Sequence, residues 1–149
     1  GKELAKNLNL NFIDSDQEIE KKCKISIPLI FEKKGEDYFR KIEEKICCKL
    51  IDGKPKILSL GGGAFINSKI RKEIKKNGVS FWISTNLENI YDRLLQSKNK
   101  RPMLDYNNLK KSIKDIYDSR KEIYKKADYT IRTKSDNKKN IVNKIIENL

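Results

Sequence analysis

Three short apolar runs, each about as long as a β-strand, follow one another along this chain. They are KILSL at 56–60, VSFWIS at 79–84 and DYTIRT at 128–133, and a stretch with helical spacing separates each run from the next. A shorter run, NFID at 11–14, comes before them. Strands that alternate with helices pair in parallel, because each helix carries the chain back to the start of the sheet. The order therefore predicts an α/β fold with a central parallel sheet covered by helices.

The helices between these runs can be placed from their apolar spacing. Apolar residues recur with a helical period in three segments: 2–8, 17–22 and 36–51. Ser26 followed by Pro28 predicts another helix start, because proline fits the first turn, and Gly35 predicts the stop of that helix. No repeat or low-complexity linker divides the 149 residues. We therefore expect a single domain over residues 1–149.

The beginning of the sequence departs from this fold class. An α/β domain normally opens with a strand, a loop and a helix, whereas this sequence opens within a helical pattern at Gly1. We expect a first strand and its loop to precede Gly1, which places the natural start roughly 15 to 20 residues earlier.

The composition argues against several kinds of site. The chain has no histidine, and its cysteines at 23, 47 and 48 lack Cys-x-x-Cys spacing. A structural zinc site, a disulfide framework and an imidazole base are therefore not expected. No apolar run has the length of a membrane-spanning helix, and no signal-peptide pattern opens the sequence. We expect a cytoplasmic protein with no membrane partner.

The net charge of +13 suits an anionic partner, such as nucleic acid or a phosphorylated ligand. However, the lysines are scattered along the helical segments, usually near glutamate, and no block of five or six like charges occurs. A nucleic-acid-binding domain would cluster its basic residues with exposed aromatic ones, and no such cluster stands out. This function stays open as an alternative, but we expect no nucleic-acid partner.

Ligands of an open parallel sheet bind beyond the carboxyl ends of its strands. Asp14, Ser15 and Asp16 follow the first run, and two carboxylates at this spacing could hold Mg²⁺ through water or accept a proton from a hydroxyl. Alternatively, Ser15 or Asp16 only caps the next helix. Three glycines at 61–63 follow the second run. They either let a ligand approach bare backbone N–H groups or only form a tight turn.

Six arginines stand among 28 lysines, so each arginine is a candidate for a role that needs its planar, two-pronged guanidinium. Arg40 lies on an apolar helical stripe beside Phe39, where an unpaired charge would be costly. Arg71 lies in a lysine-rich helix, and we expect it at the surface. Arg101 lies in the polar stretch SKNKRPMLDYNN, which is typical of a mobile flap.

Five segments together carry a more specific signal. They are DSDQEIE at 14–20, FEKKGEDYFRKIEE at 31–44, LSLGGGAF at 58–65, RPML at 101–104 and SRKEIYKKAD at 119–128. Their order and spacing resemble the shikimate kinase family of P-loop kinases, related to nucleoside-monophosphate kinases. The resemblance implies a three-layer α/β/α sandwich that acts as a monomer. The implied reaction is ATP-dependent and Mg²⁺-dependent phosphorylation of the shikimate 3-hydroxyl, in the chorismate pathway to aromatic amino acids.

The resemblance implies a substrate-binding helical region at about 15–52. In it, Asp16 would hold the shikimate hydroxyls and help deprotonate the attacking one. Arg40 and Arg120 would bind the substrate carboxylate. Backbone donors of Gly61, Gly62 and Gly63 would contact the same ligand. Phe31 and Phe39 would form part of the apolar wall beside it, although core packing explains them nearly as well.

The resemblance also implies a lid at about 97–108 and a nucleotide site. Arg101 would swing over the phosphates and stabilise their charge during transfer, so that it counts as a catalytic residue. Arg93 would stack on the adenine ring. Asp14 would lie near the metal ion and its water shell.

One family motif is absent from the sequence. The phosphate-binding loop G-x-x-x-x-G-K-[ST] does not occur, and no residue is assigned its roles. The chain as written is therefore expected to bind ATP phosphates poorly and to catalyse little. A catalytically impaired shikimate-binding relative and a gluconate kinase-like enzyme of the same fold stay open as alternatives.

Overall fold

The computed structural model describes residues 1–97, 101–133 and 137–149. They divide into two compact units, Gly1–Val79 and Ser80–Leu149. The single domain expected from the sequence stays a prediction. Among the described residues, no helix combines the length and the apolar character that crossing a membrane requires.

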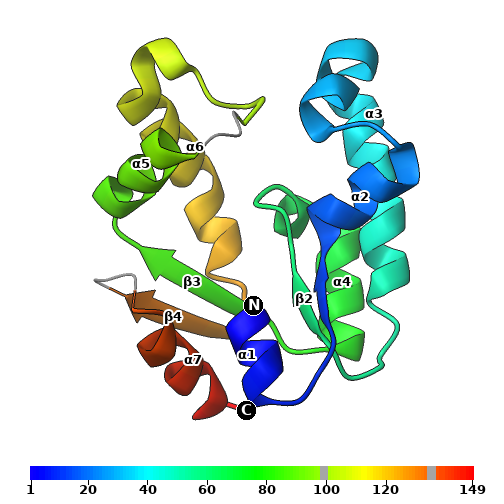
Figure 1. Ribbon diagram of the computed structural model, residues 1–149, viewed down its shortest axis with the longest axis vertical. Helices are drawn as coiled ribbons and strands as arrows, with labels where there is room; N and C mark the ends of the chain where they lie inside the picture. The colour runs from blue at the N-terminus through cyan, green and yellow to red at the C-terminus, as the bar shows by residue number, and fades with distance from the viewer. Residues whose placement is uncertain (98–100, 134–136) are drawn as a thin grey trace. The chain divides into compact units, whose positions relative to one another are not determined.

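The first unit combines helices with one pair of strands. Its elements are α1 (Lys2–Asn7), β1 (Phe12–Asp14), α2 (Ser15–Cys23), α3 (Ile27–Leu50), β2 (Ile57–Ser59), the short 3₁₀ helix η1 (Ala64–Ile66) and α4 (Ser68–Asn77). Strands β1 and β2 pair in parallel, with Asp14 opposite Ser59. Both strands therefore end at the same edge, and the segments that follow them, at 15–16 and 60–63, start close together (Figure 1).

Helix α3 is the longest element, and a glycine divides it. It begins after Ser26 with proline in its first turn, as predicted. Gly35, the predicted stop, has φ +79° and ψ 172°, a non-helical conformation inside α3 that L side chains rarely adopt. The chain resumes a helical course at once, so α3 consists of two helical stretches divided by a kink at Gly35, and the predicted stop is confirmed.

Two clusters of buried side chains hold the helices of this unit together. Ile19 of α2 packs with Ile30 and Phe39 of α3, and the Phe31 and Phe39 ring centroids are 4.7 Å apart. The second cluster joins α3, η1 and α4, which places α3 and α4 side by side (Figure 1). Its buried members are Cys47, Ala64, Ile70 and Ile74. The glycines at 61–63 therefore lead directly into a turn anchored in the core.

The second unit also contains a parallel pair of strands. Its elements are β3 (Phe81–Thr85), α5 (Leu87–Gln96), the short 3₁₀ helix η2 (Tyr106–Asn108), α6 (Leu109–Tyr124), β4 (Tyr129–Thr133) and α7 (Lys138–Ile146). Strands β3 and β4 are parallel, and the rings of Phe81 and Tyr129 stack at their start, with centroids 5.1 Å apart. Helix α7 (red in Figure 1) packs on β4, and α5 packs on α6.

All four predicted strands are present, with boundaries that differ by one or two residues from the apolar runs. Within the described residues they form two parallel pairs, one in each unit. The α/β class with parallel strands and covering helices is confirmed. The strand expected before Gly1 stays a prediction.

Candidate functional site

The triplet Asp14-Ser15-Asp16 lies at the start of α2, and each of its side chains makes different contacts. Asp14 is the N-cap: its Oδ1 accepts hydrogen bonds from the backbone N–H groups of Asp16 at 3.0 Å and Gln17 at 3.4 Å. Its extended backbone, φ −108° and ψ 120°, suits that position. The alternative that Ser15 or Asp16 caps the helix is therefore wrong. Capping by Asp14 leaves the side chains of Ser15 and Asp16 for contacts elsewhere.

Gly61 is where α2 meets the glycine segment, residues 61–63. The Gly61 N–H donates a hydrogen bond to the Ser15 hydroxyl at 2.9 Å. A Cβ atom added to Gly61 would overlap Oδ1 of Asp16. Glycine is required here because the carboxylate approaches the backbone more closely than a side chain would allow. The Asp16 carboxylate thus lies directly against the glycine segment.

Arg40 of α3 lies against the other end of the same segment. A Cβ atom on Gly63 would overlap the Arg40 guanidinium group. The arginine side chain is 28% exposed, and its charged carbon lies 5.1 Å from the centroid of the Phe39 ring. Phe39 itself is buried. The structure therefore brings Asp16, Gly61, Gly63 and Arg40 together within one unit, with a carboxylate at one end of the segment and a guanidinium at the other.

Two glutamates on α3 fix the orientation of Arg40. Its Nη1 donates to Oε2 of Glu43 at 2.7 Å, and its Nε donates to Oε1 of Glu36 at 3.2 Å. Burial lowers the pKa of Arg40, but the hydrogen bonds and charges of Glu43 and Glu36 outweigh it and raise that pKa overall. The guanidinium is therefore a permanent, oriented positive charge.

Glu43 is a residue that the sequence analysis missed. Its side chain is only 3% exposed, and a buried carboxylate requires a charged or hydrogen-bonding partner. The spacing from Arg40 to Glu43, three residues along one helix, is a signal that could have identified the pair.

Arg71 was expected at the surface, and the structure corrects this. It is half-buried on α4, and its Nη1 donates to the carbonyl oxygens of Phe65 at 2.8 Å and Ile66 at 2.6 Å. These are carbonyls of η1, the turn that directly follows the glycine segment. Arg71 therefore stabilises η1 through hydrogen bonds to its carbonyl oxygens, directly after the glycine segment.

The other predicted arginines belong to the second unit and are described only within it. Arg93 lies exposed in the last turn of α5, and Arg120 is half-buried on α6. Arg101 is exposed, and its backbone N–H donates to the Tyr106 hydroxyl at 2.8 Å. Residues 98–100 of the expected lid at 97–108 lie outside the described residues.

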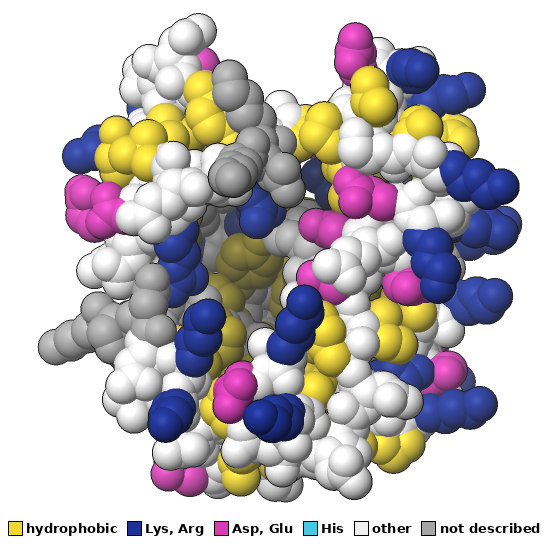
Figure 2. Space-filling model, viewed as in Figure 1, with side chains coloured by type: hydrophobic (Ala, Val, Ile, Leu, Met, Phe, Trp, Pro, Cys, Tyr) yellow, Lys and Arg dark blue, Asp and Glu magenta, His cyan; other side chains and the backbone are white. Residues whose placement is uncertain are grey.

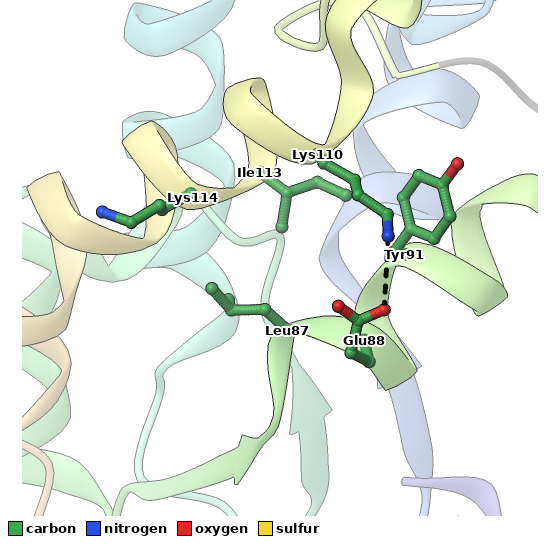
Figure 3. Close-up of a pocket in the computed structure, with 6 residues that line it drawn as sticks. All are labelled: Leu87, Glu88, Tyr91, Lys110, Ile113 and Lys114. Carbon is green, nitrogen blue, oxygen red and sulfur yellow. Dashed lines mark ion pairs between the residues drawn. The ribbon is translucent and has the colours of Figure 1, made fainter.

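A cavity of about 190 Å³ lies between α5 and α6 (Figure 3). It is lined by Leu87, Glu88, Tyr91, Lys110, Ile113 and Lys114. Its two cations already have partners, because Lys110 is 3.7 Å from Glu88 and 4.9 Å from the Tyr91 centroid, while Lys114 pairs with Asp118 at 2.7 Å. The residues predicted to bind substrate or nucleotide do not line it, so this cavity is not the candidate site.

Most of the basic side chains are spread over the surface among carboxylates and are not gathered in one binding patch on the face shown in Figure 2. Figure 2 shows Lys and Arg side chains spread over the visible face, with carboxylates between them. Several lysines form ion pairs with neighbouring carboxylates, as in Lys69 with Glu44 at 2.9 Å and Lys125 with Glu122 at 2.7 Å. Exposed pairs of this kind contribute little to stability and keep the surface hydrated.

Comparisons with known proteins identify the family to which the sequence is similar. The family model described as shikimate kinase matches residues 1–149. The shikimate kinase of Bartonella henselae is 36% identical over 149 residues, which cover all of this chain and 70% of that protein. The shikimate kinase of Persephonella marina is 38% identical over 146 residues, or 98% of this chain and 87% of the relative.

Solved structures show the same likeness. Shikimate kinase from Acinetobacter baumannii in complex with shikimate superposes with a TM-score of 0.93 at 35% identity, covering 99% of this chain and 82% of that one. Shikimate kinase from Aquifex aeolicus superposes with a TM-score of 0.83 at 33% identity, covering 99% of this chain and 85% of that one.

Proposed function

Because this chain belongs to the shikimate kinase family, we propose that it transfers the γ-phosphoryl group of ATP to the 3-hydroxyl of shikimate. The observation that carries the proposal is the arrangement around the glycine segment. A carboxylate, Asp16, lies at one end, and an oriented guanidinium, Arg40, lies at the other. Shikimate carries hydroxyls and a carboxylate, the groups that these two side chains bind best.

Arg40 is proposed to hold the substrate carboxylate. A guanidinium presents two parallel N–H donors that match the two oxygens of a carboxylate. Glu43 and Glu36 orient the guanidinium before the substrate arrives, which lowers the entropy cost of binding. Arg120 is proposed as the second arginine of this clamp, and the backbone N–H groups of the glycine segment as further donors.

Asp16 is proposed as the group that accepts the proton of the attacking hydroxyl. Its carboxylate projects from the first turn of α2 against Gly61, and Asp14 fulfils the capping role that would otherwise occupy it. A hydroxyl hydrogen-bonded to this carboxylate is held in place and becomes more nucleophilic as its proton moves to the oxygen.

Arg101 and Arg93 are proposed for the nucleotide. Phosphoryl transfer spreads negative charge over the equatorial oxygens, and an arginine beside them stabilises that charge. The exposed position of Arg101 is compatible with a side chain that engages only when ATP is bound. Closure of the segment 97–108 over the site would exclude water and limit ATP hydrolysis.

Mg²⁺ is proposed as the metal ion, with Asp14 near its water shell. No group of three metal-ligating side chains occurs among the described residues, and Mg²⁺ commonly uses one carboxylate together with substrate phosphates and water. Both capping hydrogen bonds of Asp14 are accepted by Oδ1, and its carboxylate would contribute negative charge beside the hydrated ion. When bound, the ion neutralises charge on the β- and γ-phosphates.

We also propose that the enzyme acts as a cytoplasmic monomer in the pathway to aromatic amino acids.

The direct test of the activity is ADP release from ATP and Mg²⁺ by the full-length protein, measured with shikimate, with gluconate and without acceptor. ADP release that depends on shikimate is expected. Equal rates without acceptor, or a preference for gluconate, would contradict the proposal, and shikimate binding without turnover would indicate an impaired relative.

The glycine segment provides a further prediction. Gly63→Ala is expected to raise the KM for shikimate about tenfold, because the new methyl group displaces the Arg40 guanidinium, while the KM for ATP stays unchanged. The displaced atom, Nη1, also donates to the buried Glu43, so the melting temperature is expected to fall as well, and a melting curve records that effect separately. Steady-state kinetics with each substrate varied separately measure the effect.

Gly78→Ala is the matched control. Gly78 has an extended backbone with φ −165°, and the nearest atom to an added Cβ is 3.8 Å away. This variant should keep both KM values. An unchanged shikimate KM in Gly63→Ala would show that the Arg40 position is not critical for binding.

A further inference from the structure

Ser15 occupies the centre of the proposed site without touching the substrate in the proposed binding mode. It is the first residue of α2 and is completely buried. Its hydroxyl accepts the N–H of Gly61 at 2.9 Å, across 46 positions of sequence. A buried serine hydroxyl with a long-range backbone partner joins two segments that the chain itself does not connect.

Cys47 of α3 is a buried neighbour of this hydroxyl, and Ser15 opposes the rise in the pKa of its thiol. Cys47 is fully buried, and burial, together with the charge of Glu43, raises its pKa to about 12 despite the opposing effect of Ser15. The thiol is therefore neutral at physiological pH. Cys47 lies four residues after Glu43, one helical turn from the partner of Arg40.

Ser15 links the start of α2 to the glycine segment that lies between Asp16 and Arg40. The hydrogen bond from Gly61 to the Ser15 hydroxyl ties the first turn of α2 to the start of the glycine segment. Its neighbour Asp16 lies against Gly61, and Arg40 of α3 lies against Gly63. The distance between the carboxylate, the glycine segment and the guanidinium thus depends on a contact at Ser15.

We propose that Ser15 is a positioning residue that holds the glycine segment between Asp16 and Arg40 and thereby determines the affinity for shikimate. The proposal rests on the proposed function of the site. Its role differs from those of the two flanking aspartates, since Asp14 caps the helix and Asp16 is the proposed proton acceptor. Without the hydroxyl, the Gly61 N–H loses its partner and the segment is free to move away from both side chains.

Ser15→Ala tests the proposal in the enzyme with its natural N-terminus. The KM for shikimate is expected to rise about tenfold, with kcat reduced less than about threefold and the KM for ATP unchanged. Hydrogen exchange at the Gly61 amide should also become faster. Ser15→Thr retains the hydroxyl and should restore most of the affinity for shikimate.

Ser26→Ala is the matched control, because Ser26 is exposed in the same unit and its side chain makes no capping hydrogen bond. It should keep all kinetic constants. A merely structural role of Ser15 would lower the melting temperature and leave the ratio of the two KM values unchanged, and that result would overturn the proposal.

If the Ser15→Ala variant does not fold, Ser15→Cys provides a second test of the proposal. Cysteine is similar in size and a weaker acceptor, so a rise of at least about threefold in the shikimate KM is expected. A wild-type KM in this variant would overturn the proposal. If the wild-type enzyme itself shows no shikimate-dependent ADP release, the proposed function fails instead.

Discussion

Replacing Asp16 with asparagine is expected to lower kcat for shikimate phosphorylation by roughly 10²- to 10⁴-fold, because an amide cannot accept the proton of the attacking hydroxyl. The substitution preserves shape, so the contact with Gly61 and the packing of α2 should persist. The KM for shikimate should rise only several-fold, through loss of a charged acceptor. Initial rates over a range of shikimate concentrations, together with a melting curve, measure both effects.

Asp37→Asn provides the matched control for this change. Asp37 is exposed on α3, in the same unit, and its substitution should leave kcat unchanged. If Asp16→Asn retains more than about a tenth of the wild-type kcat, Asp16 does not act as the base, and its role is restricted to holding the substrate.

The second large effect is expected at Arg40. Arg40→Ala should raise the KM for shikimate by roughly 30- to 700-fold, equivalent to about 2 to 4 kcal/mol, because the substrate carboxylate loses its charged, two-pronged partner. The KM for ATP should stay nearly constant. Arg40→Lys retains the charge but not the planar fork, so an intermediate KM is expected.

The Arg40→Ala variant is expected to change both the folding free energy and the affinity for shikimate, so the two effects need separate measurements. Removing Arg40 alone leaves the buried Glu43 carboxylate without its arginine, and breaking a buried ion pair in this way typically costs about 3 to 5 kcal/mol of folding free energy. The double variant Arg40→Met with Glu43→Gln removes both charges. It should fold more stably than Arg40→Ala and bind shikimate as weakly. A double variant with wild-type affinity would show that Arg40 does not hold the carboxylate.

The strands and helices were largely predictable from local patterns. The four apolar runs correspond to β1–β4, and the Ser26–Pro28 start of α3 is confirmed, because such signals reflect the backbone preferences of a few neighbouring residues. A glycine at 35 predicted the stop of the first helical stretch, and its positive φ interrupts α3 there. The local pattern did not show that Ile30 and Phe39, on either side of this kink, pack in one cluster.

The candidate site was predictable in part. The glycine segment, Asp16 and Arg40 were predicted to bind substrate through their resemblance to a family, and the structure places these residues in contact within one unit. Glu43, Ser15 and Arg71 were missed or misplaced. Each acts through burial and through a partner that composition does not reveal, such as the carbonyl of Phe65 for Arg71.

The sequence by itself determined the order of strands and helices, the parallel α/β class and the types of side chain available for chemistry. Only the tertiary structure decided which aspartate of the 14–16 triplet caps α2 and which contacts the glycine segment, and why Gly61 and Gly63 have no side chain. The physical reason is the parallel register of β1 and β2. It aligns Asp14 with Ser59 and brings residues 46 positions apart within hydrogen-bonding distance, a relation that no local pattern encodes.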